Sequence, residues 1–385
     1  MQNREVIVVG GGMVGALTAL LLAQLGNKVK LIEKSPCIRP MENDGFDLRV
    51  SAFSAQSKNI LVAAGIWDDL PKSRLCAYQR LQTWEKSSEK LCFDSQAVGL
   101  EALGYIAENR LIQSALWDKL KQLDNVCLYE KRQVKKIVNG YAEVSLLLDD
   151  EQSLRADLLI ACDGGNSAVR QLLQIGITAW DYRQQCLLIT IKTDIAQQNI
   201  TWQEFRESGP CAFLPLANNN ACLVWYHKPQ KIKQLQSLSN EQLKLAILQE
   251  FPALSFDFSV QDKGGFPLTR RHAQRYYQGR CVLLGDAAHT INPLAGQGVN
   301  LGFKDVQCLV DLLQHCADLP INNILQRYQS MRKPANLVMQ TAMDLFYKSS
   351  KSELPLLRIL RKGVLSAAQH SGGLKNKVMK YAMGL

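Results

Sequence analysis

Glycines near the start of the chain have the spacing of a phosphate-binding turn. Gly10, Gly12 and Gly15 form the pattern GxGxxG after an apolar run, and Glu33 ends the next apolar run. Gly10 permits a tight turn, Gly12 lets a pyrophosphate approach the backbone, and Gly15 lets a helix pack closely on a strand. The amide groups that begin this helix would face the phosphates, and Glu33 would accept from ribose hydroxyls. We therefore expect these four residues to bind a dinucleotide.

A second glycine-rich segment indicates that the dinucleotide is FAD. Gly285 and Asp286 follow another apolar run, where the Asp286 carboxylate could hold a ribityl or ribose hydroxyl. The turn that follows opens a predicted helix, whose free amide groups could face the pyrimidine edge of a flavin. The residues expected to contact the cofactor from this turn are Pro293, Gly296, Gln297, Gly298, Val299 and Asn300.

A third motif, Asp163-Gly164, follows the apolar run that ends at Cys162. With all three motifs, the chain resembles the class A flavoprotein monooxygenases. In that family the Asp-Gly motif lies near the FAD pyrophosphate and is also linked to NADPH use. The resemblance implies that NAD(P)H reduces the flavin, which then forms a hydroperoxide with O2 and hydroxylates an electron-rich ring.

Other segments resemble one group of that family, the ubiquinone-biosynthesis hydroxylases. These segments are 47–54, 83–85, 108–113, 343–347 and 381–385. The resemblance implies that Arg49, Arg110 and Gln113 contact FAD, and that the substrates are O2 and a polyprenylated benzoquinol.

The protein's own catalytic groups are few, because the sequence shows no triad, metal-ligand spacing or cysteine pair. His289 is a candidate general base, since histidine exchanges protons near neutral pH. The alternative, which we favour, is that His289 packs beside the strand end and organises its loop. Pro293 would shape the loop at the reactive edge of the flavin. The residues expected to line the substrate site, or else to be plain core, are Phe213, Pro215, Leu223 and Trp225.

The elements that position these motifs predict an α/β fold. Continuous apolar runs predict buried parallel strands at 5–9, 29–32, 156–161 and 280–284. Helical spacing predicts helices at 13–25, 56–64, 109–120 and 299–313. Shorter β-like runs predict an inserted antiparallel sheet at 186–191, 211–214 and 222–226, interrupted by one helix at 240–250.

We therefore expect a discontinuous Rossmann-like FAD-binding domain, an inserted antiparallel β-sheet substrate domain and a helical C-terminal tail. The FAD-binding domain would take residues 1–75, 99–182 and 269–345. The substrate domain would take residues 76–98 and 183–268, and the tail residues 346–385.

Charge is concentrated at the C-terminal end of the 385 residues. Residues 351–385 hold seven Lys or Arg and one Glu, a net +6 of the chain's +10. As a helix, this segment would place leucines on one side and basic residues on the other. It could lie on an anionic membrane surface or pack on protein, including a ubiquinone-biosynthesis complex. Basic residues with interleaved aromatics do not form a face, which argues against nucleic acid.

Eleven unpaired cysteines favour a reducing cytoplasm. The expected location is cytoplasmic, with peripheral contact on the inner membrane left open.

Three other functions fit the same motifs. The substrate could be a soluble phenol, the protein could be a flavin-bound scaffold without turnover, or it could be a flavin reductase that inserts no oxygen.

Overall fold

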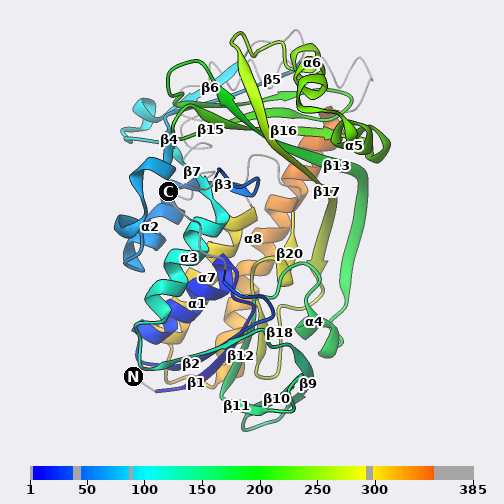
Figure 1. Ribbon diagram of the computed structural model, residues 1–385. Helices are drawn as coiled ribbons and strands as arrows, with labels where there is room; N and C mark the ends of the chain where they lie inside the picture. The colour runs from blue at the N-terminus through cyan, green and yellow to red at the C-terminus, as the bar shows by residue number, and fades with distance from the viewer. Residues whose placement is uncertain (1–2, 38–44, 86–89, 292–297, 351–385) are drawn as a thin grey trace.

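The computed structural model describes residues 3–37, 45–85, 90–291 and 298–350. A six-stranded sheet with the order β18-β19-β12-β1-β2-β8 forms one end of the molecule (Figure 1). Its strands are β1 (Glu5–Val9), β2 (Lys28–Glu33), β8 (Val126–Glu130), β12 (Leu158–Ala161), β18 (Tyr277–Gln278) and β19 (Cys281–Leu283). All neighbouring pairs are parallel except β18 with β19.

Helices and a small sheet cover the two faces of this parallel sheet (Figure 1). One face packs on α1 (Met13–Gln24), α3 (Asn109–Leu120) and α7 (Gly298–His315). The other face packs on a sheet of β9 (Val134–Asn139), β10 (Val144–Leu148) and β11 (Ser153–Ala156). With both faces covered, the strands must be apolar throughout, which is why they read as continuous runs.

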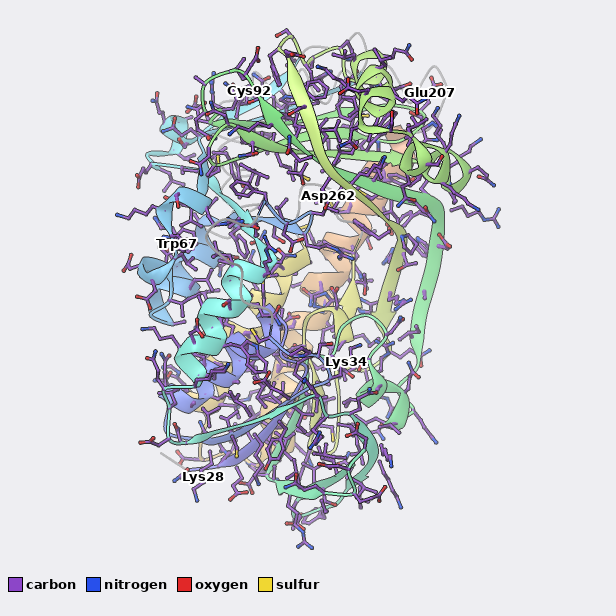
Figure 2. All side chains as sticks on the ribbon, viewed as in Figure 1. Lys28, Lys34, Trp67, Cys92, Glu207 and Asp262 are labelled. Carbon is purple, nitrogen blue, oxygen red and sulfur yellow. The ribbon has the colours of Figure 1, made fainter. Side chains whose placement is uncertain are left out.

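An eight-stranded sheet with the order β20-β17-β13-β16-β15-β14-β5-β6 forms the opposite end of the molecule. Its strands are β5 (Arg80–Glu85), β6 (Leu91–Asp94), β13 (Ile177–Thr193), β14 (Ile200–Phe205), β15 (Cys211–Leu216), β16 (Asn220–His227), β17 (Phe258–Ala273) and β20 (His289–Thr290). In Figure 2, Lys28 on β2 lies at the end of the parallel sheet, and Glu207, which follows β14, lies at the far end. The hairpin between β15 and β16 turns through Asn218 and Asn219, both left-handed at φ 57°, as a tight type I′ turn requires.

The two faces of the eight-stranded sheet have different partners. One face packs on α5 (Pro229–Ser237) and α6 (Asn240–Glu250), and the other faces the FAD-binding half of the fold. A second small sheet of β3 (Val50–Ser54), β4 (Cys76–Tyr78) and β7 (Gly104–Glu108) lies between the halves, with α2 (Ala55–Ala63) beside it. Helix α4 (Ala168–Leu172) follows β12.

The long helix α8 (Ile321–Ser350) joins the two halves (Figure 1). At one end of α8, Tyr328 donates to the carbonyl of Leu283 in the parallel sheet at 3.1 Å. At the other end, Asp344 pairs with Arg270 of β17 and accepts from Tyr182 of β13. No helix among the residues described is long and apolar enough to cross a bilayer.

The predicted α/β class with an inserted antiparallel sheet is confirmed, and two details are corrected. Two helices, α5 and α6, interrupt the sheet where one was predicted, and β13 extends far beyond the predicted strand at 186–191. The long strand β17 was not predicted. The predicted domain boundaries remain a prediction, and the tail beyond residue 350 lies outside the described residues.

Candidate active site

The glycine-rich turn has the geometry that its sequence predicts. Gly10 adopts φ +100°, and a Cβ there would lie 2.5 Å from the carbonyl oxygen of Cys162. A Cβ on Gly15 would lie 1.8 Å from the Gly10 oxygen, so the helix can approach the turn only without a side chain. Gly12, in contrast, has no atom within 4 Å of an added Cβ and opens into a cavity. It is the N-cap of α1, and no side chain caps the free amide groups there.

Side chains from two other elements hold the same turn. Glu33, at the end of β2, accepts from the amide of Gly11 at 2.5 Å. Gln113 and Trp117 of α3 both donate to the carbonyl of Gly11 at 2.8 Å. In this structure Glu33 and Gln113 therefore position the turn. Trp117 was not predicted, although it lies one helical turn after Gln113 and so on the same side of α3.

The other two motifs lie side by side and are joined by an arginine. Arg170 donates to the carbonyls of Ala287 at 2.8 Å and Gly165 at 3.0 Å. Asp163 accepts from the amide of Val169 at 3.1 Å, and its second oxygen, Oδ1, is buried without a protein partner among the described residues. Asp286 lines the cavity, and the residue is exposed there. Gly164, Gly285, Gly298 and Val299 also line the cavity.

A fully buried carboxylate, Asp305 of α7, supports the turn at Gly285. It accepts from the amide of Gly285 at 3.1 Å, from Arg332 Nε at 2.7 Å and from Asn336 Nδ2 at 3.1 Å, and it pairs with His289 Nε2. Burial alone would raise the pKa of Asp305, but His289 and Arg332 outweigh burial and lower it to about 2. His289 is 1% exposed and does not line the cavity, so its contacts here are structural, in line with the interpretation we favoured.

The remaining predicted cofactor residues have distinct surroundings. Arg49 lines the cavity and stacks over Phe266, with its guanidinium carbon 4.9 Å from the ring centre. Arg110 does not line it, and instead donates to the carbonyl of Gly45 at 2.7 Å and pairs with buried Glu108 at 3.2 Å.

Asn300 is also a supporting residue through its side chain. It donates to the carbonyl of Ala52 at 2.8 Å and accepts from the amide of Ser54 at 3.0 Å and from Ser57 Oγ at 2.6 Å. It thereby ties the start of α7 to β3 and α2. Pro293, Gly296 and Gln297 lie outside the described residues.

One cavity of about 470 Å³ joins these motifs to the eight-stranded sheet. Its sheet side is mainly apolar. The lining residues of that side include Leu81, Leu188, Thr201, Gln203, Ala212, Leu214, Val224, Tyr226, Phe266 and Leu268.

The four residues predicted to line the substrate site lie elsewhere. Phe213, Leu223 and Trp225 belong to the core under α5 and α6, on the opposite face of the sheet. Pro215 is two residues after Phe213 in β15 and does not line the cavity either. The prediction named strands that line the cavity but selected side chains of the opposite face. Successive side chains of a strand point to opposite faces, so a shift of one position exchanges the core for the cavity. The residues one position away, Ala212, Leu214, Val224 and Tyr226, line the cavity instead.

The features of the cavity fit FAD. The uncapped start of α1 and the open position of Gly12 suit a pyrophosphate, and the Asp286 carboxylate suits a hydroxyl group. Asp163 lies between the lining residues Cys162 and Gly164, and its unpaired buried oxygen suits a second one. Fold and site together define a flavin-dependent oxidoreductase.

Comparison with known proteins identifies the family. Residues 3–342 match the FAD binding domain family. The chain is 42% identical to the 3-demethoxyubiquinol 3-hydroxylase of Escherichia coli, over 100% of this chain and 99% of the relative. It is 32% identical to a mitochondrial ubiquinone biosynthesis monooxygenase of Xenopus tropicalis, over 98% and 93%. The chain therefore belongs to the FAD-binding domain family, as one of its FAD-dependent aromatic-ring monooxygenases.

A solved structure has the same fold. The p-nitrophenol 4-monooxygenase of Pseudomonas putida superposes with a TM-score of 0.78 at 20% identity, covering 98% of this chain and 96% of that one. At this identity the likeness concerns the fold alone.

Replacing Asp305 tests whether its ionised carboxylate supports the site. Asp305→Asn leaves Arg332 buried without its counter-charge, so we expect a loss of about 3–5 kcal/mol in the free energy of unfolding at neutral pH. The lowered pKa of Asp305 means that its stabilisation is present above about pH 4 and is lost as pH falls towards 2. Urea unfolding at several pH values should therefore show the deficit shrinking across that range.

Asp311→Asn is the matched control, because Asp311 lies on the same helix and is exposed. It should leave stability nearly unchanged. An Asp305→Asn deficit that stays constant between pH 5 and about pH 2 would contradict the ionic role.

Proposed function

We propose that this enzyme hydroxylates the ring of a polyprenylated benzoquinol in ubiquinone biosynthesis, using FAD, O2 and NAD(P)H. The observation that carries the proposal is the 42% identity over the whole chain to an enzyme named for hydroxylating demethoxyubiquinol. The cavity supports it independently, because its sheet side suits an uncharged ring with an apolar tail.

The charges that line the cavity suit a polyprenylated quinol better than a soluble phenolic acid. Among the described lining residues, Arg49 and Asp286 are the charged ones. Asp286 belongs to a glycine-rich motif, and Arg49, which precedes β3, stacks on Phe266 of the sheet. Among the described lining residues, a carboxylate substrate could therefore pair only with Arg49, which we propose to hold the cofactor, and an unpaired buried charge is costly. The cavity therefore favours a neutral quinol.

The protein's part in the reaction is to bind, orient and exclude water. Bound FAD, once reduced, supplies the activated oxygen atom. We propose that Gly12, with the start of α1, holds the pyrophosphate, and that Asp163, Asp286 and Arg49 hold other parts of the cofactor. Glu33, Gln113 and Asn300 fix the backbone around it through the contacts described above. The apolar sheet face keeps water from the reacting ring.

Anaerobic stopped-flow reduction tests the proposal. The purified flavoprotein is mixed with NADPH or NADH, with and without a short-chain demethoxyubiquinol analogue. We expect the analogue to accelerate bleaching of the flavin, and admission of O2 to yield hydroxylated product.

Each alternative predicts a different result. Bound FAD that neither nicotinamide reduces, with or without the analogue, would contradict the hydroxylase and favour the scaffold. Flavin reduction with no oxygen from labelled O2 in the product would favour a reductase.

We further propose that the C-terminal end contacts an anionic membrane surface, where a polyprenyl substrate resides. Met331, Val338 and Leu345 of α8 are 58%, 60% and 70% exposed, and their spacing of seven residues sets them on one side of the helix. The net +6 of residues 351–385 follows this apolar line. Apolar side chains beside basic ones are typical of helices that lie in an anionic interface.

Vesicle flotation tests the membrane contact. The full chain should float with vesicles that contain phosphatidylglycerol and not with pure phosphatidylcholine, and salt should weaken the binding. Val338→Glu should reduce flotation several-fold, whereas Val138→Glu, at a 54% exposed position of β9, should not. Absence of flotation at low salt, or equal flotation of the two variants, would contradict the proposal.

A further inference from the structure

Gln203 is a polar side chain of the cavity that has no hydrogen bond to the described part of the protein. Gln203 of β14 is 7% exposed and lines the cavity, and its amide makes no hydrogen bond with any described residue. The neighbouring polar groups are satisfied, since Thr201 donates to the carbonyl of Phe213 at 2.9 Å and Glu204 pairs with Arg206. The amide is open to the cavity, where its donor and acceptor can bond a ligand or a water.

The direction of Gln203 follows from the pleat of the sheet. Trp202, the residue before it, stacks on Phe213 with ring centres 5.8 Å apart, in the core under α5 and α6. Alternation along the strand therefore sends Gln203 to the opposite face, where the cavity lies.

The neighbours of Gln203 across the sheet form an apolar row. Gln203 pairs with Ala212, Ala212 with Val224, and Val224 with Leu188, and all four line the cavity. A flat ring can pack on the three apolar members, while the amide at the end of the row reaches an oxygen on its edge. A primary amide both donates and accepts, and so does a phenolic hydroxyl.

We infer that Gln203 is a specificity-determining residue that hydrogen-bonds a ring oxygen of the quinol and so sets which ring carbon faces the flavin. The inference rests on the proposed function, because it takes a quinol as the ligand. The apolar substituent of the quinol ring would pack at the opposite end of the row, at Leu188 and beyond. A ring held at one oxygen against a fixed row has one orientation, which is what reaction at a single ring carbon requires.

Gln203→Met tests the inference, because methionine keeps the length and unbranched shape of the side chain and removes its donor and acceptor. With the short-chain demethoxyubiquinol analogue, we expect kcat/KM to fall about tenfold, as for loss of one neutral hydrogen bond. A larger share of NAD(P)H should be consumed without product, and hydroxylation should spread to other ring positions. The thermal midpoint should stay close to that of the wild type, because Gln203 makes no hydrogen bond to a described residue that the substitution could remove.

Gln261→Met is the matched control. Gln261 is exposed on β17 of the same sheet and donates to Ser259 Oγ at 2.8 Å, and its variant should keep wild-type turnover and product pattern. If the two variants give the same kinetics and products, Gln203 does not orient the ring. A lowered thermal midpoint of Gln203→Met with unchanged KM and product pattern would also overturn the inference, in favour of a structural role. A wild type that makes no hydroxylated product from the analogue would instead overturn the proposed function.

Discussion

The buried carboxylate of Asp305 connects the parts of the protein that must stay in register for the site to exist. One oxygen holds the Gly285 amide and His289, so it fixes the turn that carries Asp286. The other holds Arg332 and Asn336 of α8. The same helix carries Asp344, which pairs with Arg270 of the eight-stranded sheet. A charge buried in this way is stable only while all its partners remain in place. Through this one group, the cofactor turn and the substrate sheet are held in a fixed relation.

The division of the eight-stranded sheet into two faces gives the active site its shape. One face is closed by α5 and α6 over the aromatic cluster of Trp202, Phe213 and Trp225. The other face remains open to the glycine-rich motifs, with a small apolar row and one free amide. Because the core under α5 and α6 is packed by the covered face, the side chains of the open face are available to contact a ligand. This arrangement explains how an amide such as Gln203 can face the cavity without a protein partner.

Local patterns in the sequence predicted the strands and turns of the FAD-binding half closely, because these turns depend on backbone positions that only glycine can occupy. Gly10 and Gly15 are required by contacts of 2.5 and 1.8 Å that any Cβ would make, so the motif is visible in a single sequence. The network of Asp305 was not predicted, since its partners come from α8 and from loops distant in the chain. The side chains predicted to line the substrate site lie on the opposite face of the sheet from the cavity, one position along the strand from residues that do line it. Alternation defines two faces of a strand but does not tell which face the helices will cover, and of the two covering helices α5 was not predicted.

A crystal structure of the FAD-loaded enzyme with the demethoxyubiquinol analogue, grown without oxygen, tests the account most directly. The account predicts the pyrophosphate at Gly12 and the start of α1, and the quinol ring between the flavin and the row of Leu188, Val224, Ala212 and Gln203. A ring bound outside this cavity, or against the face that carries Phe213 and Trp225, would contradict it.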